Sequence, residues 1–294
     1  MASQQDIKRR IRSVSSTHKI TKAMELIAAA KLRRSQQRIV AMRPYADRML
    51  ELIISTAQTL GKVYGLPLLE DREMHSIALL PLTGDRGLAG AFNAQVLRRS
   101  FTLEHDLQAQ GIEVKWLVSG KRGRSSLRFR KREIETSWTG FSDQPEFAEA
   151  QAIAHRLAEL YASGAADAVL LVYNRFGTAM VQTVVEQEIL PLPKQVLENF
   201  DESAAAPPVR GEVLFEPDPE IILGRLIPAY LETEVFRALL ESAASEHGAR
   251  MSAMRNASKN ADELIELLTL IMNRARQATI TQEILEVVAG ADAL

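Results

Sequence analysis

Long stretches without helix-breaking residues stand at both ends of this 294-residue chain. Residues 1–43 contain neither proline nor glycine, and residues 229–294 contain no proline. Because proline removes a backbone donor and clashes with the preceding turn, its absence favours uninterrupted helices. At about 1.5 Å per residue, the C-terminal helix would reach roughly 100 Å, and the N-terminal one, continued to about Leu60, roughly 85 Å. Helices of this length need burial along one side, so we expect each to pack against the other.

The two terminal segments carry opposite net charge. Residues 1–43 hold eleven Lys or Arg against two acidic residues, whereas residues 229–294 hold six basic and ten acidic residues. Opposite charge favours pairing of the two segments along their length. Over the whole chain, 36 basic and 37 acidic side chains nearly cancel. The molecule as a whole therefore has no net field that would attract a polyanion.

Apolar spacing gives the N-terminal helix a predicted buried face. This stripe consists of Ile7, Ile11, Val14, His18, Ile20, Met24 and Ile27. Three alanines at 28–30 would let another helix approach closely. Pro44 is expected to bend or divide the helix, which then resumes up to about Leu60.

The last long helix is predicted to begin after Pro228. Its apolar or small positions are Leu240, Ala243, His247, Met251, Met254, Ser258, Ala261, Ile265, Leu268, Met272, Ala275 and Thr279. From Met254 onward the steps alternate between four and three, as in a coiled-coil heptad, and the extra four-residue step near His247 is a stutter. Because this helix is the longer one, its apolar end should overhang the pair, with Ile284, Leu285, Val287, Val288 and Leu294 at the tip. An apolar tip of this kind is typical of a surface that is buried in an assembly.

The middle of the chain has a different pattern of apolar residues. Short apolar runs at 76–82, 113–118 and 168–173 are predicted strands, and the segments 91–110 and 145–161 between them are predicted helices. Strands that alternate with helices indicate βαβ units and a mostly parallel sheet. Residues 181–189 are a candidate for a further, antiparallel strand.

The predicted fold class is therefore α/β. A long antiparallel coiled coil of the N- and C-terminal helices is joined to a central Rossmann-like domain with a mostly parallel sheet. The expected boundaries are 1–60 for the first helix, 70–200 for the α/β domain, 201–212 for a linker, and 213–294 for the C-terminal helical segment. The linker begins with DESAAAPPVR, which is polar and rich in small residues and proline.

Several kinds of chemistry find no support in the sequence. The chain has no cysteine, which excludes disulfides, thiolate catalysis and Cys-based zinc sites. The five histidines are scattered without the spacing of metal ligands, and no nucleophile, base and orienting residue form a set. We therefore expect no catalytic residue, no cofactor and no metal. No apolar run approaches the length of about 18 residues that a membrane-spanning helix needs.

The glycine-rich segment GDRGLAG, residues 84–90, follows the first predicted strand. A phosphate-binding loop occupies this position in some α/β proteins, but the segment lacks the Lys and the Ser or Thr of a P-loop and the glycine spacing of a dinucleotide site. A tight turn between strand and helix is the simpler interpretation, and nucleotide binding is the weaker alternative.

Three segments together resemble one family. They are IKRRIRSVSSTHKITKAMELIAAAKLRRSQ near the N-terminus, GDRGLAGAFN at 84–93, and SEHGARMSAMRNASKNA with NRARQATITQEILEVVAGADAL at the C-terminus. In this order they resemble the γ subunit of the F-type ATP synthase of bacterial type, the central-stalk rotor inside a ring of catalytic subunits. The chain differs from the family pattern at Ala89 and Ala91, where Cys and Gly are common, and it lacks the chloroplast insert with its cysteine pair.

The resemblance implies roles for three sets of residues. The residues that would contact the catalytic ring are Lys19, Lys22, Met24, Lys31, Arg33, Arg34, Arg274, Arg276 and Gln277. A foot that meets the ε subunit and the membrane c-ring includes Gly84, Asp85, Arg86, Gly87 and Gly90. The apical tip consists of the five apolar residues named above, from Ile284 to Leu294.

The resemblance also implies partners and a location. The partners would be the α and β subunits of the catalytic ring, the ε subunit and the c-ring, with one copy per complex, no homo-oligomer and no nucleic acid. The chain would lie at the cytoplasmic side of the cell membrane as a peripheral subunit. It would have no catalytic site of its own, and its rotation would couple proton or sodium flow to ATP synthesis.

Plainer interpretations remain open for the same residues. The basic stripe of residues 1–43 could be a solvated helix face, and Arg274 and Arg276 could be favourable cations near a helix C-terminus. The rival from another class is a nucleic-acid-binding or scaffold protein that dimerises through its terminal helices. Residues 1–43 contain no aromatic side chain that could stack on bases, which weighs against nucleic acid.

Overall fold

A computed structural model describes residues 4–60, 68, 72–178, 181–191 and 218–292. The chain divides into two compact units. The first contains residues 1–29 and 250–294, and the second contains residues 30–249. Helix α1, Gln4–Leu60, and helix α6, Pro219–Asp292, each contribute to both units.

The second unit contains a five-stranded sheet with the order β3-β2-β1-β4-β5. The strands are β1 Ser76–Pro81, β2 Glu113–Ser119, β3 Thr136–Trp138, β4 Ala168–Phe176 and β5 Gln182–Leu190. Strands β1 to β4 are parallel to their neighbours, and β5 pairs with β4 in the antiparallel direction. The predicted Rossmann-like domain with a mostly parallel sheet is confirmed, and so is the antiparallel strand expected at 181–189.

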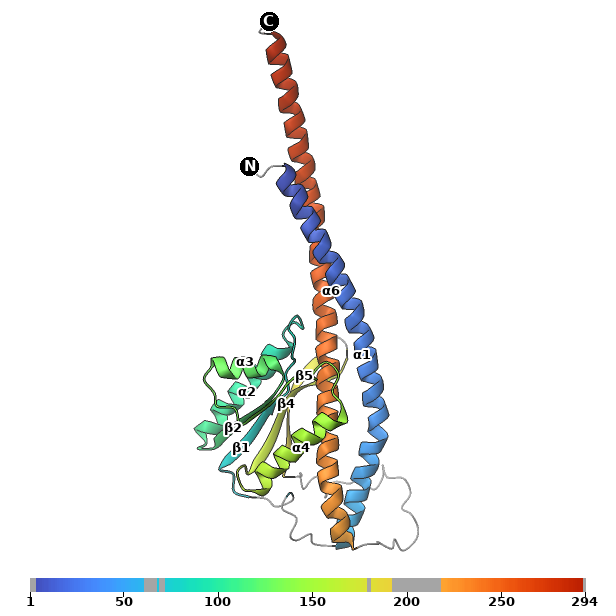
Figure 1. Ribbon diagram of the computed structural model, residues 1–294, viewed down its shortest axis with the longest axis vertical. Helices are drawn as coiled ribbons and strands as arrows, with labels where there is room; N and C mark the ends of the chain where they lie inside the picture. Colours follow the sequence, from blue (N-terminus) through green and yellow to red (C-terminus); the bar gives the residue numbers. More distant parts are fainter. Residues whose placement is uncertain (1–3, 61–67, 69–71, 179–180, 192–217, 293–294) are drawn as a thin grey trace. The chain divides into compact units, whose positions relative to one another are not determined.

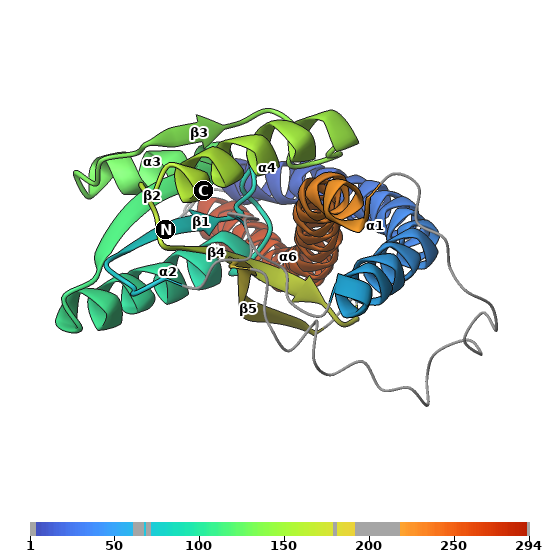
Figure 2. The same cartoon turned by 90° about the horizontal axis from the view of Figure 1, so that it is seen from below.

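Helices cover both faces of this sheet. The helices are α2 Phe92–Ala109, α3 Lys121–Phe129 and α4 Phe147–Ala162. Apolar residues of α2 and α3, such as Val96 and Leu127, pack with Leu79 and Val118 on one face. Residues of α4 and α6 pack on the other face around Leu80. Figure 2 shows α2 and α4 on opposite sides of the sheet. Because every residue of β1 is buried, the strand reads as a continuous apolar run.

Within the second unit, α6 lies between the sheet and α1 (Figure 1). One side of α6 presents Leu231, Val235 and Leu239 to the sheet core. Another side presents Leu223 and Ile227 to α1. From Tyr230 to Ala249 the helix has no exposed residue, which explains why no simple two-face pattern marks this part of α6.

The expected start of the last helix after Pro228 was wrong, and of the two outcomes expected at Pro44, a bend or a division, the structure excludes the division. Helix α1 continues through Pro44 without division, and α6 begins at Pro219 and contains Pro228. The missing donor of a proline costs one helical bond, which packing of the flanking residues can offset. Around Pro44 that packing comes from Ala46 and Met49, which are both buried. Pro219 occupies the first helical position, where a proline suits the helix start.

The buried side of α1 follows a regular heptad that the predicted stripe only partly matches. Buried or half-buried positions include Ile7, Ile11, Val14, His18, Thr21, Glu25, Ala28, Leu32, Ser35, Ile39, Met42, Ala46, Met49, Ile53 and Thr56. The steps alternate between four and three throughout, as in a coiled coil. Ile20 and Ile27, which were assigned to the buried stripe, are 60% and 57% exposed. The physical reason is that polar Thr21 and Glu25 occupy the seam and find bonding partners there.

Two short elements, α3 and β3, were not predicted. Helix α3 is dominated by basic residues, and β3 spans three residues, so neither has the apolar pattern that marks its neighbours. The residues expected to form the linker, 201–212, lie outside the described part of the chain.

Candidate functional site

Three side-chain pairs fix the register of the helix pair in the first unit. Thr21 Oγ1 lies 2.8 Å from Ser258 Oγ. Arg255 Nε donates to Glu25 Oε1 at 3.0 Å, and His18 Nε2 lies 3.2 Å from Asp262 Oδ1. The partner number on α6 rises as the number on α1 falls, so the two helices are antiparallel. The predicted antiparallel coiled coil is confirmed by this pairing.

The buried carboxylate of Glu25 has two cationic partners in the first unit. Lys22 Nζ donates to its Oε2 at 3.0 Å, and Arg255 holds its other oxygen. The hydrogen bonds from Lys22 and from Arg255 lower the pKa of Glu25 below its ordinary value, against a smaller opposing effect of burial. A buried carboxylate with two cationic partners is kept ionised and gives the seam a polar, directional contact.

The expected ring-contact residues of the first unit lie mostly on its surface. Lys19 and Lys22 on α1 are exposed, and Met24 is half-buried beside the seam. On α6, the residues Arg274, Arg276 and Gln277 are also exposed. These side chains are therefore accessible to another molecule in the unit, although the ammonium group of Lys22 already bonds to Glu25.

The other three expected ring contacts belong to the second unit. Arg33 and Arg34 are exposed. Lys31 instead forms an ion pair with Asp143, in the loop between β3 and α4. Its ammonium group therefore already has a carboxylate partner within the chain.

The overhanging end of α6 is apolar and exposed. Ile284, Leu285, Val287 and Val288 are each more than half exposed. Leu294 lies outside the described residues. Exposed apolar side chains of this density are typical of a surface that meets another protein.

In the loop after β1, the carboxylate of Asp85 points toward backbone amides of neighbouring segments. Asp85 accepts hydrogen bonds from the backbone nitrogens of Lys121 at 3.0 Å, Gly140 at 2.8 Å and Ser142 at 3.1 Å. A doubly wound α/β fold offers a phosphate group this kind of position, at a helix N-terminus beyond the strand ends. Here the anion is the protein's own Asp85 side chain.

The glycines of this loop differ in their surroundings. Gly84 is buried, and a Cβ there would lie 2.8 Å from the carboxylate of Glu246 on α6. A Cβ at Gly87 would lie 3.0 Å from the guanidinium of Arg122. Gly90 has a φ of 56°, which favours glycine, and Arg86 is exposed. A larger residue at 84 or 87 would therefore displace the end of a side chain, the Glu246 carboxylate of α6 or the Arg122 guanidinium of α3.

Sequence reasoning missed Leu88, at the tip of the same loop. Its side chain is 64% exposed, and its φ is 64°. An exposed apolar residue in the left-handed region is uncommon and is a candidate contact point. The glycines on either side of it were a signal, because they mark a projecting turn.

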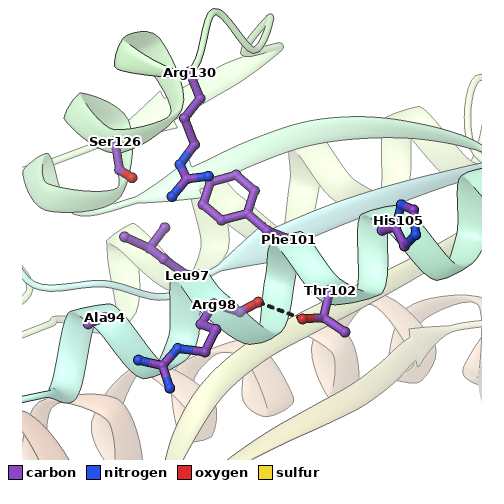
Figure 3. Close-up of a pocket in the computed structure, with 8 residues that line it drawn as sticks. All are labelled: Ala94, Leu97, Arg98, Phe101, Thr102, His105, Ser126 and Arg130. Carbon is purple, nitrogen blue, oxygen red and sulfur yellow. Dashed lines mark hydrogen bonds between the residues drawn. The ribbon is translucent and has the colours of Figure 1, made fainter.

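Sequence reasoning also missed a basic groove between α2 and α3, shown in Figure 3. It has a volume of about 650 Å³ and is lined by Ala94, Leu97, Arg98, Phe101, Thr102, His105, Ser126 and Arg130. The guanidinium of Arg130 lies 4.2 Å from the centre of the Phe101 ring, which is a cation–π contact. The run of basic residues from Lys121 to Arg132 was the signal in the sequence.

Two kinds of feature are absent from the part of the chain that the structure describes. Among these residues, no helix combines the length and apolar character required to cross a lipid bilayer. Within the same ranges, no group of three or more His, Asp or Glu side chains is arranged as a metal site would be.

Fold and site together define a class of protein. It pairs two long terminal helices in the antiparallel direction and joins them to a Rossmann-like domain, whose phosphate position holds an aspartate. The exposed features are helix surfaces, a projecting loop and an apolar helix end. Features of this kind characterise a component of an assembly.

Comparison with known proteins identifies the family. The family model described as ATP synthase matches residues 3–294. The ATP synthase gamma chain of Rubrobacter xylanophilus is 45% identical over 298 residues, covering 100% of this chain and 99% of the relative. That of Moorella thermoacetica is 43% identical over 296 residues and covers 100% of both. The chain belongs to the ATP synthase gamma chain family.

Solved structures agree with this assignment. A chain from the central stalk and c-ring of Tetrahymena thermophila mitochondrial ATP synthase matches with a TM-score of 0.60 and 29% identity. The match covers 81% of this chain and 99% of that one. A chain from Euglena gracilis mitochondrial ATP synthase has a TM-score of 0.67 at 18% identity, covering 99% and 94%. At that identity the second match supports the fold alone.

Proposed function

We propose that this chain is the rotating central stalk of an F-type ATP synthase. In this function a membrane ring driven by proton or sodium flow turns the α/β domain, and the helix pair turns inside a ring of α and β subunits. The chain contributes no catalytic residue and changes the conformations of the β subunits in turn. Membership of the gamma chain family, at 41–45% identity over the full length, supports this proposal most strongly.

The unequal faces of the helix pair supply a physical basis for such a function. A partner shifts a conformational equilibrium only by as much as its affinities for the states differ. Basic side chains such as Lys19 and Lys22 are exposed on α1, while exposed leucines such as Leu264 and Leu267 stand on α6. Three surrounding subunits that met such different faces would each be stabilised in a different state.

We assign the ring contacts to Lys19, Lys22, Met24, Arg33, Arg34, Arg274, Arg276 and Gln277, with Lys31 as a further member. Electrostatic attraction that depends little on fine register suits a surface that has to slide past its partner. The apolar end of α6, including Ile284 and Val287, would form the apical bearing. Its exposure in the first unit supports this assignment.

The loop at 84–90 is assigned to the foot that meets the ε subunit and the c-ring. Exposed Arg86 and Leu88 are the side chains of this loop that are free to reach a partner surface. In this arrangement one copy of the chain serves each complex, at the cytoplasmic side of the cell membrane as a peripheral subunit. The match to a chain from the central stalk and c-ring of Tetrahymena thermophila mitochondrial ATP synthase supports the location at a c-ring.

Reconstitution tests the proposal. The chain should restore ATP-driven rotation and ion pumping when it is combined with the remaining ATP synthase subunits, whereas complexes that lack it should not pump. Because the chain has no cysteine, Leu88→Cys would place a unique crosslinking label on the loop. Crosslinks to ε or to the c-ring would support the foot assignment, and crosslinks to β alone would reject it.

The rival is a protein that dimerises through its terminal helices and binds nucleic acid. In each unit described here, α1 pairs with α6 of the same chain, which favours the stalk. Purification separates the two possibilities. Elution with the other ATP synthase subunits supports the stalk, and a self-contained oligomer with salt-sensitive nucleic-acid binding supports the rival.

A further inference from the structure

The loop between β3 and α4 connects the α/β domain to both long helices within the second unit. We call residues 140–146 the joint loop. Asp143 in this loop forms an ion pair with Lys31 of α1. His247 Nε2 of α6 lies 3.0 Å from the Asp143 backbone oxygen and 3.8 Å from its Oδ1. One aspartate therefore contacts α1 and α6 at the same time.

Arg38 adds a second connection to α1. Its guanidinium donates to the backbone oxygen of Pro145, also in the joint loop. The same guanidinium lies 5.7 Å from the centre of the Phe236 ring on α6. Phe236 in turn makes an edge contact with Phe147, at the start of α4. The two cations of α1 thus bond to the loop two residues apart, at Asp143 and Pro145.

The far end of the joint loop is fixed to the sheet. The carboxylate of Asp85 holds the amides of Gly140 and Ser142, and the Asp85 amide donates to Ser142 Oγ at 2.8 Å. Asp85 follows β1 and also holds the first amide of α3. A continuous set of bonds therefore runs from the end of β1, through the joint loop, to α1 and α6.

The connection to α1 is polar, whereas the connection to α6 is largely apolar. Leu231, Val235 and Leu239 of α6 belong to the core of the sheet. A second apolar cluster, which contains Met49 and Ile53 of α1, packs α1 against α6. Between α1 and the joint loop lies a cleft of about 390 Å³ that includes Arg34, Asp143 and His247 in its lining. Since close packing is absent from that cleft, directional polar bonds have to hold the joint loop against α1.

We propose that the joint loop is a direct polar link that makes α1 turn together with the α/β domain, beside the apolar connection through α6, with Asp143, Lys31, Arg38 and His247 as its positioning residues. This inference rests on the proposed rotary function. Apolar contact is non-directional, so it fixes no particular geometry where the surfaces do not interdigitate. Ion pairs and hydrogen bonds with fixed geometry resist the lateral force that a driven rotor experiences.

The charge surroundings of Asp143 fit this role. Burial raises the pKa of the Asp143 carboxyl, but the Lys31 hydrogen bond and the nearby His247 and Arg86 lower it below its ordinary value overall. These groups approach from α1, from α6 and from the loop after β1. The carboxylate is consequently ionised at neutral pH, as its contacts require.

The test compares Asp143→Asn with wild type in the whole complex reconstituted into vesicles. The readout is the ratio of ATP-driven ion pumping to ATP hydrolysis. We expect Asp143→Asn to lower this ratio at least several-fold while hydrolysis continues, and Asp143→Glu to recover much of it. Glu135→Gln is the matched control, because it removes an ion pair with Arg156 inside the α/β domain. That control should behave as wild type.

The outcomes separate the inference from the function on which it rests. A wild-type chain that supports no pumping would overturn the proposed function itself. If the wild-type complex pumps and Asp143→Asn has the same ratio of pumping to hydrolysis, the inference about the joint loop would be overturned. Should Asp143→Asn fail to assemble, Arg38→Gln breaks the link at Pro145 instead, and a normal ratio in that variant would overturn the inference as well.

Discussion

Glu25 shows how a single charge can serve a helix seam. Its carboxylate is buried, yet Lys22 and Arg255 each hold one of its oxygens. The cations themselves are more than half exposed, so their charges remain hydrated. This arrangement avoids most of the desolvation cost of a fully buried ion pair.

Replacement of Glu25 by Gln should destabilise the folded chain by about 1 kcal/mol at pH 7, a value that allows for the exposure of both cations. The folded-state pKa of Glu25 is lowered, so its contribution is present above the ordinary pKa near 4.5 and is lost as pH falls through the folded value. Urea unfolding of both proteins at pH 7 and at pH 3 measures this. A difference that grew on acidification would contradict the assignment.

Gly120 is needed for two separate reasons. Its φ is 96°, and a Cβ there would lie 2.0 Å from the backbone oxygen of Thr83. Gly140 has a similar φ of 109°, with no heavy atom within 4 Å of an added Cβ. Comparing alanine substitutions at Gly120 and Gly140 therefore separates the cost of backbone strain from the cost of a direct clash.

We expect Gly120→Ala to cost about 4 kcal/mol or more, because strain and clash add, and Gly140→Ala to cost about 1–2 kcal/mol from strain alone. Thermal unfolding followed by circular dichroism measures both. Equal losses in the two variants would show that the contact with Thr83 relaxes at no cost.

At the scale of secondary-structure elements, strands β1, β2, β4 and β5 and the two terminal helices were predictable because their apolar spacing is strong, whereas the three-residue strand β3 was not. The seam of α1 was predictable only as far as His18, since the apolar pattern there coincides with the heptad. Beyond that point Thr21 and Glu25 take seam positions while Ile20 and Ile27 face outward. A hydrophobicity pattern cannot foresee this exchange, because it depends on partners such as Ser258 and Arg255 that lie more than 200 residues away.

The candidate site was predictable to a different extent. A family resemblance identified exposed residues such as Lys19 and Arg276, and the described structure finds both exposed. Nothing in the local sequence, however, links Lys31 to Asp143 or Asp85 to Gly140. Such pairs arise only when the fold brings a loop beside a distant helix, as for Lys31 and Asp143, or beside another loop, as for Asp85 and Gly140. Helix α3 was missed for a related reason, since it is held by Gly123 and Leu127 rather than by a long apolar face.

A larger side chain at Ala28 tests how closely the two helices approach in the first unit. Ala28 is 2% exposed in the seam, whereas its neighbour Ile27 faces outward. Ala28→Leu should destabilise by about 1–3 kcal/mol, because the larger side chain forces the helices apart. The control Ile27→Ala should change stability by no more than about 0.5 kcal/mol. Thermal unfolding followed by helical circular dichroism compares them. An equal effect of both would place the seam elsewhere.

At the scale of the whole molecule, the free end of α6 distinguishes folding from assembly. Residues from Arg276 to Ala289 are all exposed, so few contacts within the chain depend on them. The apolar side chains among them stabilise the chain little in isolation, because their surface stays in water. Their contribution should instead come from a partner.

A chain that ends at Thr279 should therefore unfold at nearly the same temperature as the full chain. It should also associate less with itself and bind the remaining subunits less tightly, because an apolar surface has been removed. Sedimentation of the isolated chain and recovery of assembled complex measure these two effects. A large drop in melting temperature would show that the end of α6 belongs to the folded core.

The antiparallel register of α1 and α6 also restricts how the chain can change in length. Inserting one residue into either helix rotates everything beyond it by about 100°, which turns the seam away from its partner. An insertion of seven residues restores the facing side, but it shifts every cross-helix pair by two turns. Variation in size among related chains should therefore concentrate in the connections around the sheet, while the spacing from His18 to Glu25 and from Arg255 to Asp262 stays constant.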